Sequence, residues 1–182
     1  RKLIRSIRQA LNLQPNELIK FRNRYIILKE DSIENLGKIF GIIFYIKCVK
    51  SDLDKINEAA LSMIKKEKTF RISAKKSILL NKSSQNINEE VGAYILSKNP
   101  DIKVNLNNPE IDIRIEELGN KAFIYKASDI KKCLGGLPIG TGGFVNLIVK
   151  DEINSTVAGF LLMKRGCVIS LSKDLSLLHK FE

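Results

Sequence analysis

Residues 110–127 read EIDIRIEELGNKAFIYKA, and this stretch predicts a β-hairpin. Ile111, Ile113 and Ile115 alternate with charged residues, which is the two-residue period of a strand that buries one face. A Gly-Asn pair then supplies a tight turn, and a second apolar stretch begins at Lys121. The chain is therefore built around at least one β-sheet with a buried face.

Helical and strand patterns alternate on the N-terminal side of this hairpin. Apolar residues recur at helical spacing over residues 2–13 and over 53–64, where Ser51 is placed to cap the second helix. By the same criteria we expect further helices at 32–40 and 88–97, and strands at 25–28, 42–49 and 68–75. This mixture predicts an α+β fold.

On the C-terminal side, the glycine-rich sequence LGGLPIGTGG at residues 134–143 predicts a linker. An apolar run at 144–149, a helix at 155–165 and a strand at 167–171 then predict one βαβ unit with parallel strands. A single βαβ unit cannot form a free-standing sheet, so it docks on the preceding part, pairs with another chain or belongs to a longer protein.

The composition excludes several classes of protein. The 182 residues are 44% hydrophobic, which suffices for a buried core, and no apolar run is long enough to cross a bilayer, so we expect no membrane anchor. Cys48, Cys133 and Cys167 lie far apart without metal-binding spacing, which favours a cytoplasmic compartment and buried, unreactive thiols. With one histidine in the chain, we expect neither a metal site nor a bound cofactor.

The charge of the chain is unevenly distributed. There are 31 Lys and Arg against 20 Asp and Glu, a net charge of +11. Residues 1–29 carry a net +7 of this excess and residues 62–82 a net +6. Two basic clusters on an otherwise balanced chain are typical of a surface that binds a polyanion such as a nucleic acid. The alternative is a surface whose charge only keeps the protein soluble.

Four stretches of the chain occur in an order that resembles the tRNA 4-thiouridine synthetases. They are KTFRISAKK at 68–76, NPEIDIRIEE at 108–117, GGLPIGT at 135–141 and LLMKRGC at 161–167. The resemblance implies four parts. These are an incomplete ferredoxin-like N-terminal module at 1–50, a THUMP RNA-binding domain at 51–133, the glycine-rich linker at 134–143, and a βαβ remnant of a PP-loop adenylation domain at 144–182.

In that family the first two modules hold the acceptor stem and the 3′ CCA end of tRNA, so the resemblance implies tRNA as the partner. It assigns phosphate contacts to basic residues of both modules, with Lys68, Arg71, Lys75 and Lys76 as the main set and Arg22, Arg24 and Lys82 in support. For each single residue the alternative is a solvated side chain, because alternation in a strand directs some side chains away from a shared face.

The nucleotide loop of the family, Ser-Gly-Gly-X-Asp-Ser, has a degenerate counterpart at residues 150–155, which read KDEINS. Only Ser155 matches, because the other family residues are replaced by Lys150, Asp151, Glu152 and Asn154. The glycines of the family loop let the backbone approach phosphate, whereas the carboxylates here add negative charge. We therefore expect a loop closed to ATP, with Ser155 acting as a helix cap.

The resemblance and the degenerate loop together support one leading hypothesis. The chain is expected to bind the acceptor stem and CCA end of tRNA and to act with a separate PP-loop or sulfur-transfer enzyme, since it ends soon after the βαβ unit. A first rival is a 4-thiouridine synthetase whose site is completed by another chain. A second rival is a structural homodimer that forms through the βαβ unit.

Overall fold

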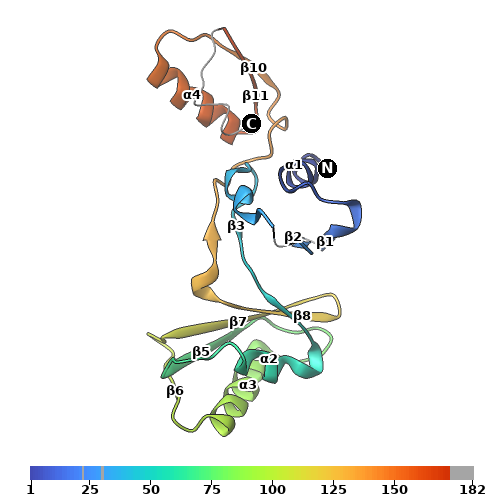
Figure 1. Ribbon diagram of the computed structural model, residues 1–182, viewed down its shortest axis with the longest axis vertical. Coiled ribbons are helices and arrows are strands. Elements are labelled where there is room, and N and C mark those ends of the chain that lie inside the picture. Colours follow the sequence, from blue (N-terminus) through green and yellow to red (C-terminus); the bar gives the residue numbers. More distant parts are fainter. Residues whose placement is uncertain (22, 30, 173–182) are drawn as a thin grey trace. The chain divides into compact units, whose positions relative to one another are not determined.

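The computed structural model describes residues 1–21, 23–29 and 31–172 (Figure 1). Backbone contacts divide the chain into two compact units. Ile46–Ile130 form the central unit, and Arg1–Tyr45 together with the chain from Lys131 onward form the flanking unit. The domain boundaries expected at residues 50, 133 and 143 stay predictions.

A five-stranded sheet forms the central unit, in the order β4-β8-β7-β5-β6. Its strands are β4 (Val49–Asp52), β5 (Thr69–Ala74), β6 (Lys103–Val104), β7 (Ile111–Leu118) and β8 (Lys121–Lys126). Strands β7 and β8 pair antiparallel as the predicted hairpin, which is confirmed. Strand β5 runs parallel to both β7 and β6. The mixed α/β architecture expected from the sequence is also confirmed.

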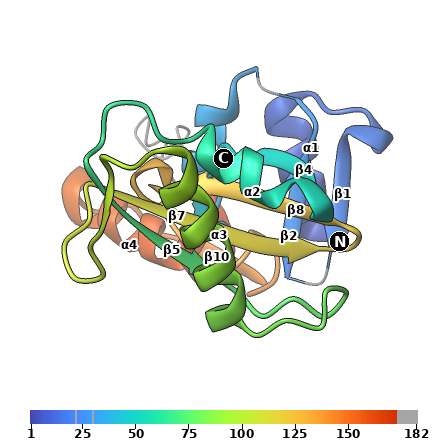
Figure 2. The same cartoon turned by 90° about the horizontal axis from the view of Figure 1, so that it is seen from below.

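Two helices, α2 (Ile56–Leu61) and α3 (Ser84–Lys98), cover one face of this sheet (Figure 2). The buried core lies between the helices and the apolar side chains that alternate along the strands. Its members include Phe70, Ile72, Val91, Ile95, Ile113 and Ile124. The opposite face of the sheet carries the polar residues of β5 and β7 and is called the open face below.

Several predicted elements of the central unit begin or end at residues other than those expected. The helix expected at 53–64 is shorter, because a 3-10 turn (Leu53–Lys55) precedes α2 and Ser51 lies in β4 rather than at a helix start. Helix α3 begins earlier than expected, since the Ser83 hydroxyl accepts the Asn86 backbone N–H at 3.1 Å and caps it. A second 3-10 turn, Ala127–Asp129, follows β8.

The N-terminal half of the flanking unit is built on α1 (Lys2–Leu11) and an antiparallel hairpin of β1 (Leu18–Phe21) and β2 (Arg24–Ile27). Its core contains apolar residues from these elements and from a 3-10 helix, namely Ile7, Leu11, Leu13, Leu18, Ile33 and Leu36. That 3-10 helix (Ile33–Lys38) replaces the α-helix expected at 32–40, and another 3-10 turn (Pro15–Glu17) precedes β1.

The single strand expected at 42–49 is two strands in two different sheets. Strand β3 (Phe44–Tyr45) pairs antiparallel with β9 (Lys131–Lys132) in the flanking unit. Strand β4 pairs with β8 in the central unit. The segment expected as one strand therefore connects the two units, because its last residue, Val49, already belongs to the sheet of the central unit.

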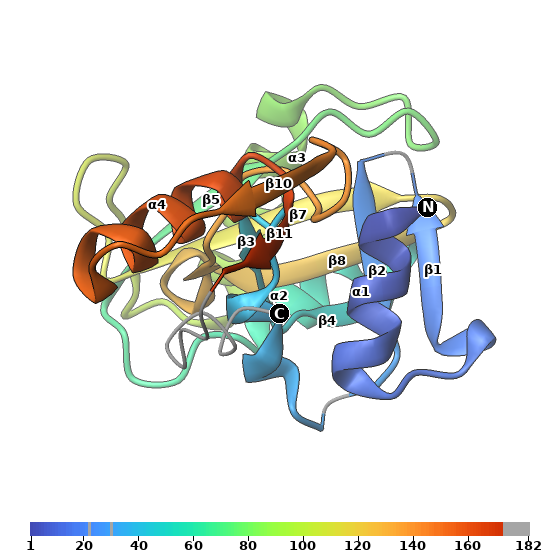
Figure 3. The same cartoon turned by 90° about the horizontal axis from the view of Figure 1, so that it is seen from above.

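The predicted βαβ unit is confirmed. Strands β10 (Phe144–Leu147) and β11 (Val168–Leu171) pair in parallel, and α4 (Glu152–Lys164) lies alongside them (Figure 3). Phe40 and Met163 are buried together in this part, and the rings of Phe40 and Phe160 lie 5.4 Å apart. The unit therefore packs on a residue from the N-terminal half of the flanking unit.

The glycine-rich segment at 134–143 contacts the C-terminal end of α4. The Leu137 N–H donates to the Lys164 carbonyl at 2.9 Å, and the Gly142 N–H donates to the Gly166 carbonyl at 2.8 Å. Gly136 has a positive φ of 77°, and a Cβ there would lie 2.3 Å from the Lys164 carbonyl oxygen. Only glycine allows this close approach of backbone to helix end. Across the residues that the structure describes, no helix has the length and apolar character that a membrane span requires.

Candidate nucleic-acid interface

The loop between β5 and α3 brings three of the predicted basic residues together. Lys75 and Lys76 follow β5 directly, and Lys82 precedes α3. Ser77 and Lys82 pair across the loop, with N–H to carbonyl distances of 3.1 and 3.3 Å in the two directions. This bridge closes the loop, so Lys75, Lys76 and Lys82 lie at the same end of the sheet.

The same loop is anchored to the sheet by a carboxylate. Glu117 of β7 accepts a hydrogen bond from the buried Ser77 hydroxyl and another from the Leu79 backbone N–H at 3.3 Å. At the tip, the side chains of Ile78 and Leu79 are 66% and 59% exposed. The loop therefore presents two apolar side chains between lysines on a fixed base.

The open face of the sheet carries a network of ion pairs. The Arg71 guanidinium donates to the Asp112 carboxylate at 2.6 Å, and the Ser73 hydroxyl donates to its other oxygen at 2.6 Å. Arg114 approaches the same carboxylate at 3.5 Å. One step further along the sheet, the Lys75 ammonium lies 2.6 Å from Glu116.

These ion pairs shift the pKa values of the groups that form them. Partial burial opposes ionisation of Asp112, but hydrogen bonds from Arg71 and Ser73 outweigh it and lower the pKa of Asp112. The hydrogen bond between Arg71 and Asp112 also raises the pKa of Arg71. Lys82 pairs with Glu90 of α3. Three of the seven predicted contacts, Arg71, Lys75 and Lys82, therefore already have a carboxylate partner within the protein.

The remaining predicted contacts lie in different places. Lys68 precedes β5 and Lys76 follows it, so they stand at opposite ends of this strand; both are exposed, and within the described ranges neither forms an ion pair. In the flanking unit, Arg24 lies over the Phe44 ring, 5.7 Å from its centroid. Arg22 lies outside the described residues. The assignment of these residues to RNA contacts stays a prediction.

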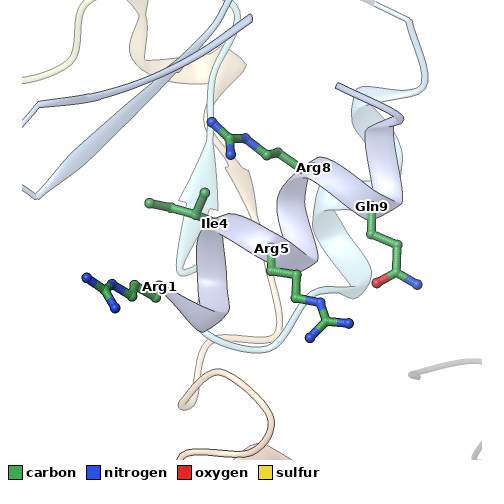
Figure 4. A pocket seen from close by; sticks show the side chains of 5 residues that line it. All are labelled: Arg1, Ile4, Arg5, Arg8 and Gln9. Atoms are coloured by element: carbon green, nitrogen blue, oxygen red, sulfur yellow. The ribbon is translucent and has the colours of Figure 1, made fainter. Parts of the chain in front are cut away.

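Helix α1 carries arginines that were not among the predicted contacts. Arg1, Arg5 and Arg8 recur at helical spacing and, with Ile4 and Gln9, line a pocket (Figure 4). The i, i+4, i+7 spacing within the first basic cluster was the signal that could have identified them.

The start of α4 is capped by an acidic side chain. The Asp151 carboxylate accepts the Asn154 backbone N–H at 2.9 Å and the Asn154 side-chain amide at 3.0 Å. The backbone hydrogen bond from Asn154 has the larger effect and the side-chain hydrogen bond the smaller, and both lower the pKa of Asp151. Ser155 is buried inside the first turn, so its expected role as helix cap is wrong and Asp151 has that role. Lys150 and Glu152 are exposed beside it.

The thiols match expectation at one position of three. Cys167 is buried, as predicted, whereas Cys48 is exposed and Cys133 is half-buried, so the burial expected for those two is wrong. Both lie within three residues of a point where the chain passes from one unit to the other. Among the described residues, no three His, Cys, Asp or Glu side chains come together as a metal site.

Comparison with known proteins agrees with this geometry. Residues 50–126 match the model of the THUMP domain family. A probable tRNA sulfurtransferase of Mycoplasmopsis agalactiae is 35% identical over 164 residues, which cover 86% of this chain and 42% of that protein. The chain contains a THUMP domain and is similar in sequence to the tRNA sulfurtransferases. The predicted resemblance to the 4-thiouridine synthetases is thereby confirmed.

Two solved structures have folds similar to that of this chain. A 4-thiouridine synthetase in complex with RNA and bound ATP aligns with a TM-score of 0.74 and 27% identity, over 93% of this chain and 46% of that one. The protein PH1313 from Pyrococcus horikoshii aligns with a TM-score of 0.79 and 31% identity, over 99% of this chain and 70% of that one. The chain thus spans less than half the length of the sulfurtransferase that it matches.

Proposed function

We propose that this chain is a cytoplasmic tRNA-binding protein that recognises the acceptor stem and 3′ CCA end and acts with a separate catalytic partner. The observation that carries the proposal is the β5–α3 loop of the THUMP domain, which gathers Lys75, Lys76 and Lys82 at one end of the sheet. Similarity to the tRNA sulfurtransferases supports tRNA as the polyanion.

The chemistry of the loop suits an RNA end. Lysine ammonium groups bind phosphates as point charges and give salt-dependent affinity. The exposed tip formed by Ile78 and Leu79 offers apolar surface to unstacked bases, which carry the sequence information in single-stranded RNA. Lys76 is the main candidate for a phosphate contact here, since Lys75 and Lys82 share their charge with Glu116 and Glu90.

The start of α4 supports a partner for the ATP-dependent step. A phosphate bound at a helix N-terminus needs free backbone N–H groups and room close to the backbone. Here the Asp151 carboxylate already accepts the Asn154 N–H, and Glu152 adds a second negative charge in the first turn. These residues do not fit the triphosphate of ATP, so we assign adenylation to another protein.

A second candidate function has one observation in its favour. Phe144 and Ile153 of the βαβ unit are 88% and 77% exposed, and such large exposed apolar side chains are typical of a surface that another chain or segment covers. This would suit a sulfurtransferase completed by another chain, or a homodimer. Titration calorimetry with ATP and Mg²⁺ distinguishes the sulfurtransferase from our proposal. A sulfurtransferase should give a heat of ATP binding, whereas our proposal expects none.

The proposal is tested by filter binding of intact tRNA and of the same tRNA without its CCA end, over a range of salt concentrations. We expect binding that weakens as salt rises and that weakens further on trimming. Lys76→Gln should reproduce part of the salt effect, with Lys55→Gln, on the helix-covered side of the sheet, as the matched control. Equal binding of the two RNAs would contradict recognition of the CCA end, and no binding would contradict the proposal as a whole.

A further inference from the structure

Ser77 and Glu117 form a hydrogen-bonded pair at the base of the β5–α3 loop. Ser77 is only 3% exposed, and its hydroxyl donates to the Glu117 carboxylate. The same carboxylate accepts the Leu79 N–H at 3.3 Å, and the Ser77 hydroxyl oxygen accepts the Leu80 N–H at 3.1 Å. Two successive backbone N–H groups at the tip of the loop therefore have their acceptors in this pair.

The rest of the loop is a tight turn that the pair fastens to the sheet. The Asn81 N–H donates to the Ile78 carbonyl at 3.2 Å, and Asn81 has a left-handed φ of 50°, which asparagine tolerates better than most residues. The backbone bridge between Ser77 and Lys82 closes the turn. Lys76 and Lys82 stand on either side of it, so the contacts with Glu117 set the positions of both lysines before any ligand binds.

The charge of Glu117 opposes the ligand that the loop is proposed to bind. Within residues 1–21, 23–29 and 31–172, no Lys or Arg forms an ion pair with this carboxylate, whereas Glu116 beside it pairs with Lys75. A carboxylate close to bound RNA repels phosphate, so charge alone predicts tighter binding when Glu117 is removed. Such a carboxylate supports RNA binding only if its hydrogen bonds contribute more than its charge costs.

We infer that Glu117 and Ser77 are positioning residues for the RNA site, so that an acidic side chain strengthens the binding of a polyanion. They hold the β5–α3 loop in its binding conformation and act through Lys76 and Lys82. The inference rests on the proposed function, because it takes RNA as the ligand of the loop. A pair that only stabilised the fold would leave the affinity of the folded protein unchanged.

Loss of the carboxylate should release the turn while leaving its lysines in place. The loop must then become ordered as RNA binds, and the ordering of one residue alone lowers affinity about tenfold. The number of phosphates contacted stays the same, so the salt dependence of binding is retained. This separates lost positioning from a lost contact such as Lys76→Gln, which should reduce the salt slope by about 1.

The test is fluorescence-anisotropy titration of an RNA minihelix, with a duplex stem and a single-stranded CCA end, against the full chain at several salt concentrations. The variants are Glu117→Ala, Ser77→Ala, their combination, and Glu117→Gln, which keeps one acceptor oxygen. The control is Glu90→Gln, which also removes a carboxylate beside the loop, but one that contacts the side chain of Lys82. Circular dichroism melts establish that each variant is folded; if Glu117→Ala is not, Ser77→Ala and Glu117→Gln decide the matter.

We expect Glu117→Ala and Ser77→Ala each to bind the minihelix about tenfold more weakly than wild type, with the salt slope unchanged. The combination should be no weaker than either alone, because both break the same anchor. Glu117→Gln should lie between wild type and Glu117→Ala. The control should bind at least as tightly as wild type, because it frees the charge of Lys82.

A second measurement needs no RNA. In limited digestion by trypsin, followed by mass spectrometry, cleavage after Lys76 should be faster in Glu117→Ala than in wild type, because a released loop enters the protease more readily. Glu90→Gln should be cleaved there at the wild-type rate.

Equal or tighter RNA binding by folded Glu117→Ala and Ser77→Ala would overturn the inference and leave the proposed function intact. A loss that Glu90→Gln shares, or a loss with a reduced salt slope, would also overturn it. If the wild-type chain binds no RNA, the proposed function fails and the inference fails with it, even where faster cleavage shows that the pair orders the loop.

Discussion

The open face of the central sheet and the exposed side of α1 are both rich in arginine and lysine, yet their charges differ in availability. On the sheet, Asp112 pairs with Arg71 and lies 3.5 Å from Arg114, so one negative charge is shared by two positive ones, and Glu116 pairs with Lys75. On α1 the arginines have no such partners among the described residues. A count of basic residues therefore overstates the positive charge that the sheet has available for an anion, because a paired cation must first lose its carboxylate.

The largest effect that would test this comparison is removal of the carboxylate at the centre of the open face. We expect Asp112→Ala to lower the free energy of unfolding by about 2 kcal/mol, because it leaves Arg71, Arg114 and Ser73 without their shared acceptor. Urea unfolding followed by circular dichroism measures it. Asp101→Ala, at an exposed position after α3, is the control and should be close to neutral. If Asp112→Ala and Asp101→Ala lower the free energy of unfolding equally, the ion pairs around Asp112 contribute no stability of their own.

A second prediction compares a free lysine with a paired one in the same loop. We expect Lys76→Gln to weaken tRNA binding about fivefold and to reduce the salt slope by about 1, as for one lost phosphate contact. Lys75→Gln should weaken it about twofold, because Glu116 already shares that charge. Filter binding at several salt concentrations gives both values. A larger loss for Lys75 than for Lys76 would break the comparison.

A third prediction concerns a carboxylate that the central unit also holds internally. Backbone N–H donors of Lys65 and Lys66, at 2.7 and 2.9 Å, together with Lys126, lower the pKa of Glu67 to about 2. A lowered folded-state pKa means that the stabilisation is present above the unfolded value and is lost as pH falls from about 4.5 towards 2.

Because Glu67 is partly exposed, we expect it to contribute about 1 kcal/mol, well below what the pKa shift alone would give. Urea unfolding of wild type and Glu67→Gln at pH 7 and at pH 2.5 measures the contribution. The difference between the two proteins should shrink at the lower pH. A difference that does not change with pH would exclude this carboxylate as the titrating group.

The smallest expected effect is at the start of α4, where Asp151 neutralises a helix N-terminus. We expect Asp151→Ala to lower the melting temperature by about 2 °C, and Asp151→Asn, which keeps a capping acceptor, to lower it less. Differential scanning calorimetry resolves this difference. If alanine and asparagine behave alike, the side-chain hydrogen bond to Asn154 has no role in capping.

The parts of the fold that could be predicted are those with a local pattern. The β7–β8 hairpin follows from alternating isoleucines and a Gly-Asn turn, and the parallel pairing of β10 with β11 follows from two apolar runs around a helix. Short 3-10 segments such as Ile33–Lys38 escaped because their periodicity over one or two turns resembles that of an α-helix.

The candidate site was less predictable, because its decisive contacts join residues far apart in sequence. Arg71 and Asp112 are 41 residues apart and meet only through the parallel register of β5 and β7. No local pattern of charges indicates which cations such a register will neutralise. An acidic residue directly before a helix is a common N-cap, so the sequence contains a signal for the Asp151 cap, whereas the resemblance to the family loop indicated Ser155.

The Asp151 cap also constrains how this chain can change over evolutionary time. Substitution of Asp151 by glycine, a first step towards a phosphate-binding loop, removes two hydrogen bonds to Asn154 and adds backbone freedom in the unfolded state. That step lowers stability before any nucleotide can compensate for it. Selection for stability alone therefore favours the capped form, by the small free energy that the Asp151 cap supplies.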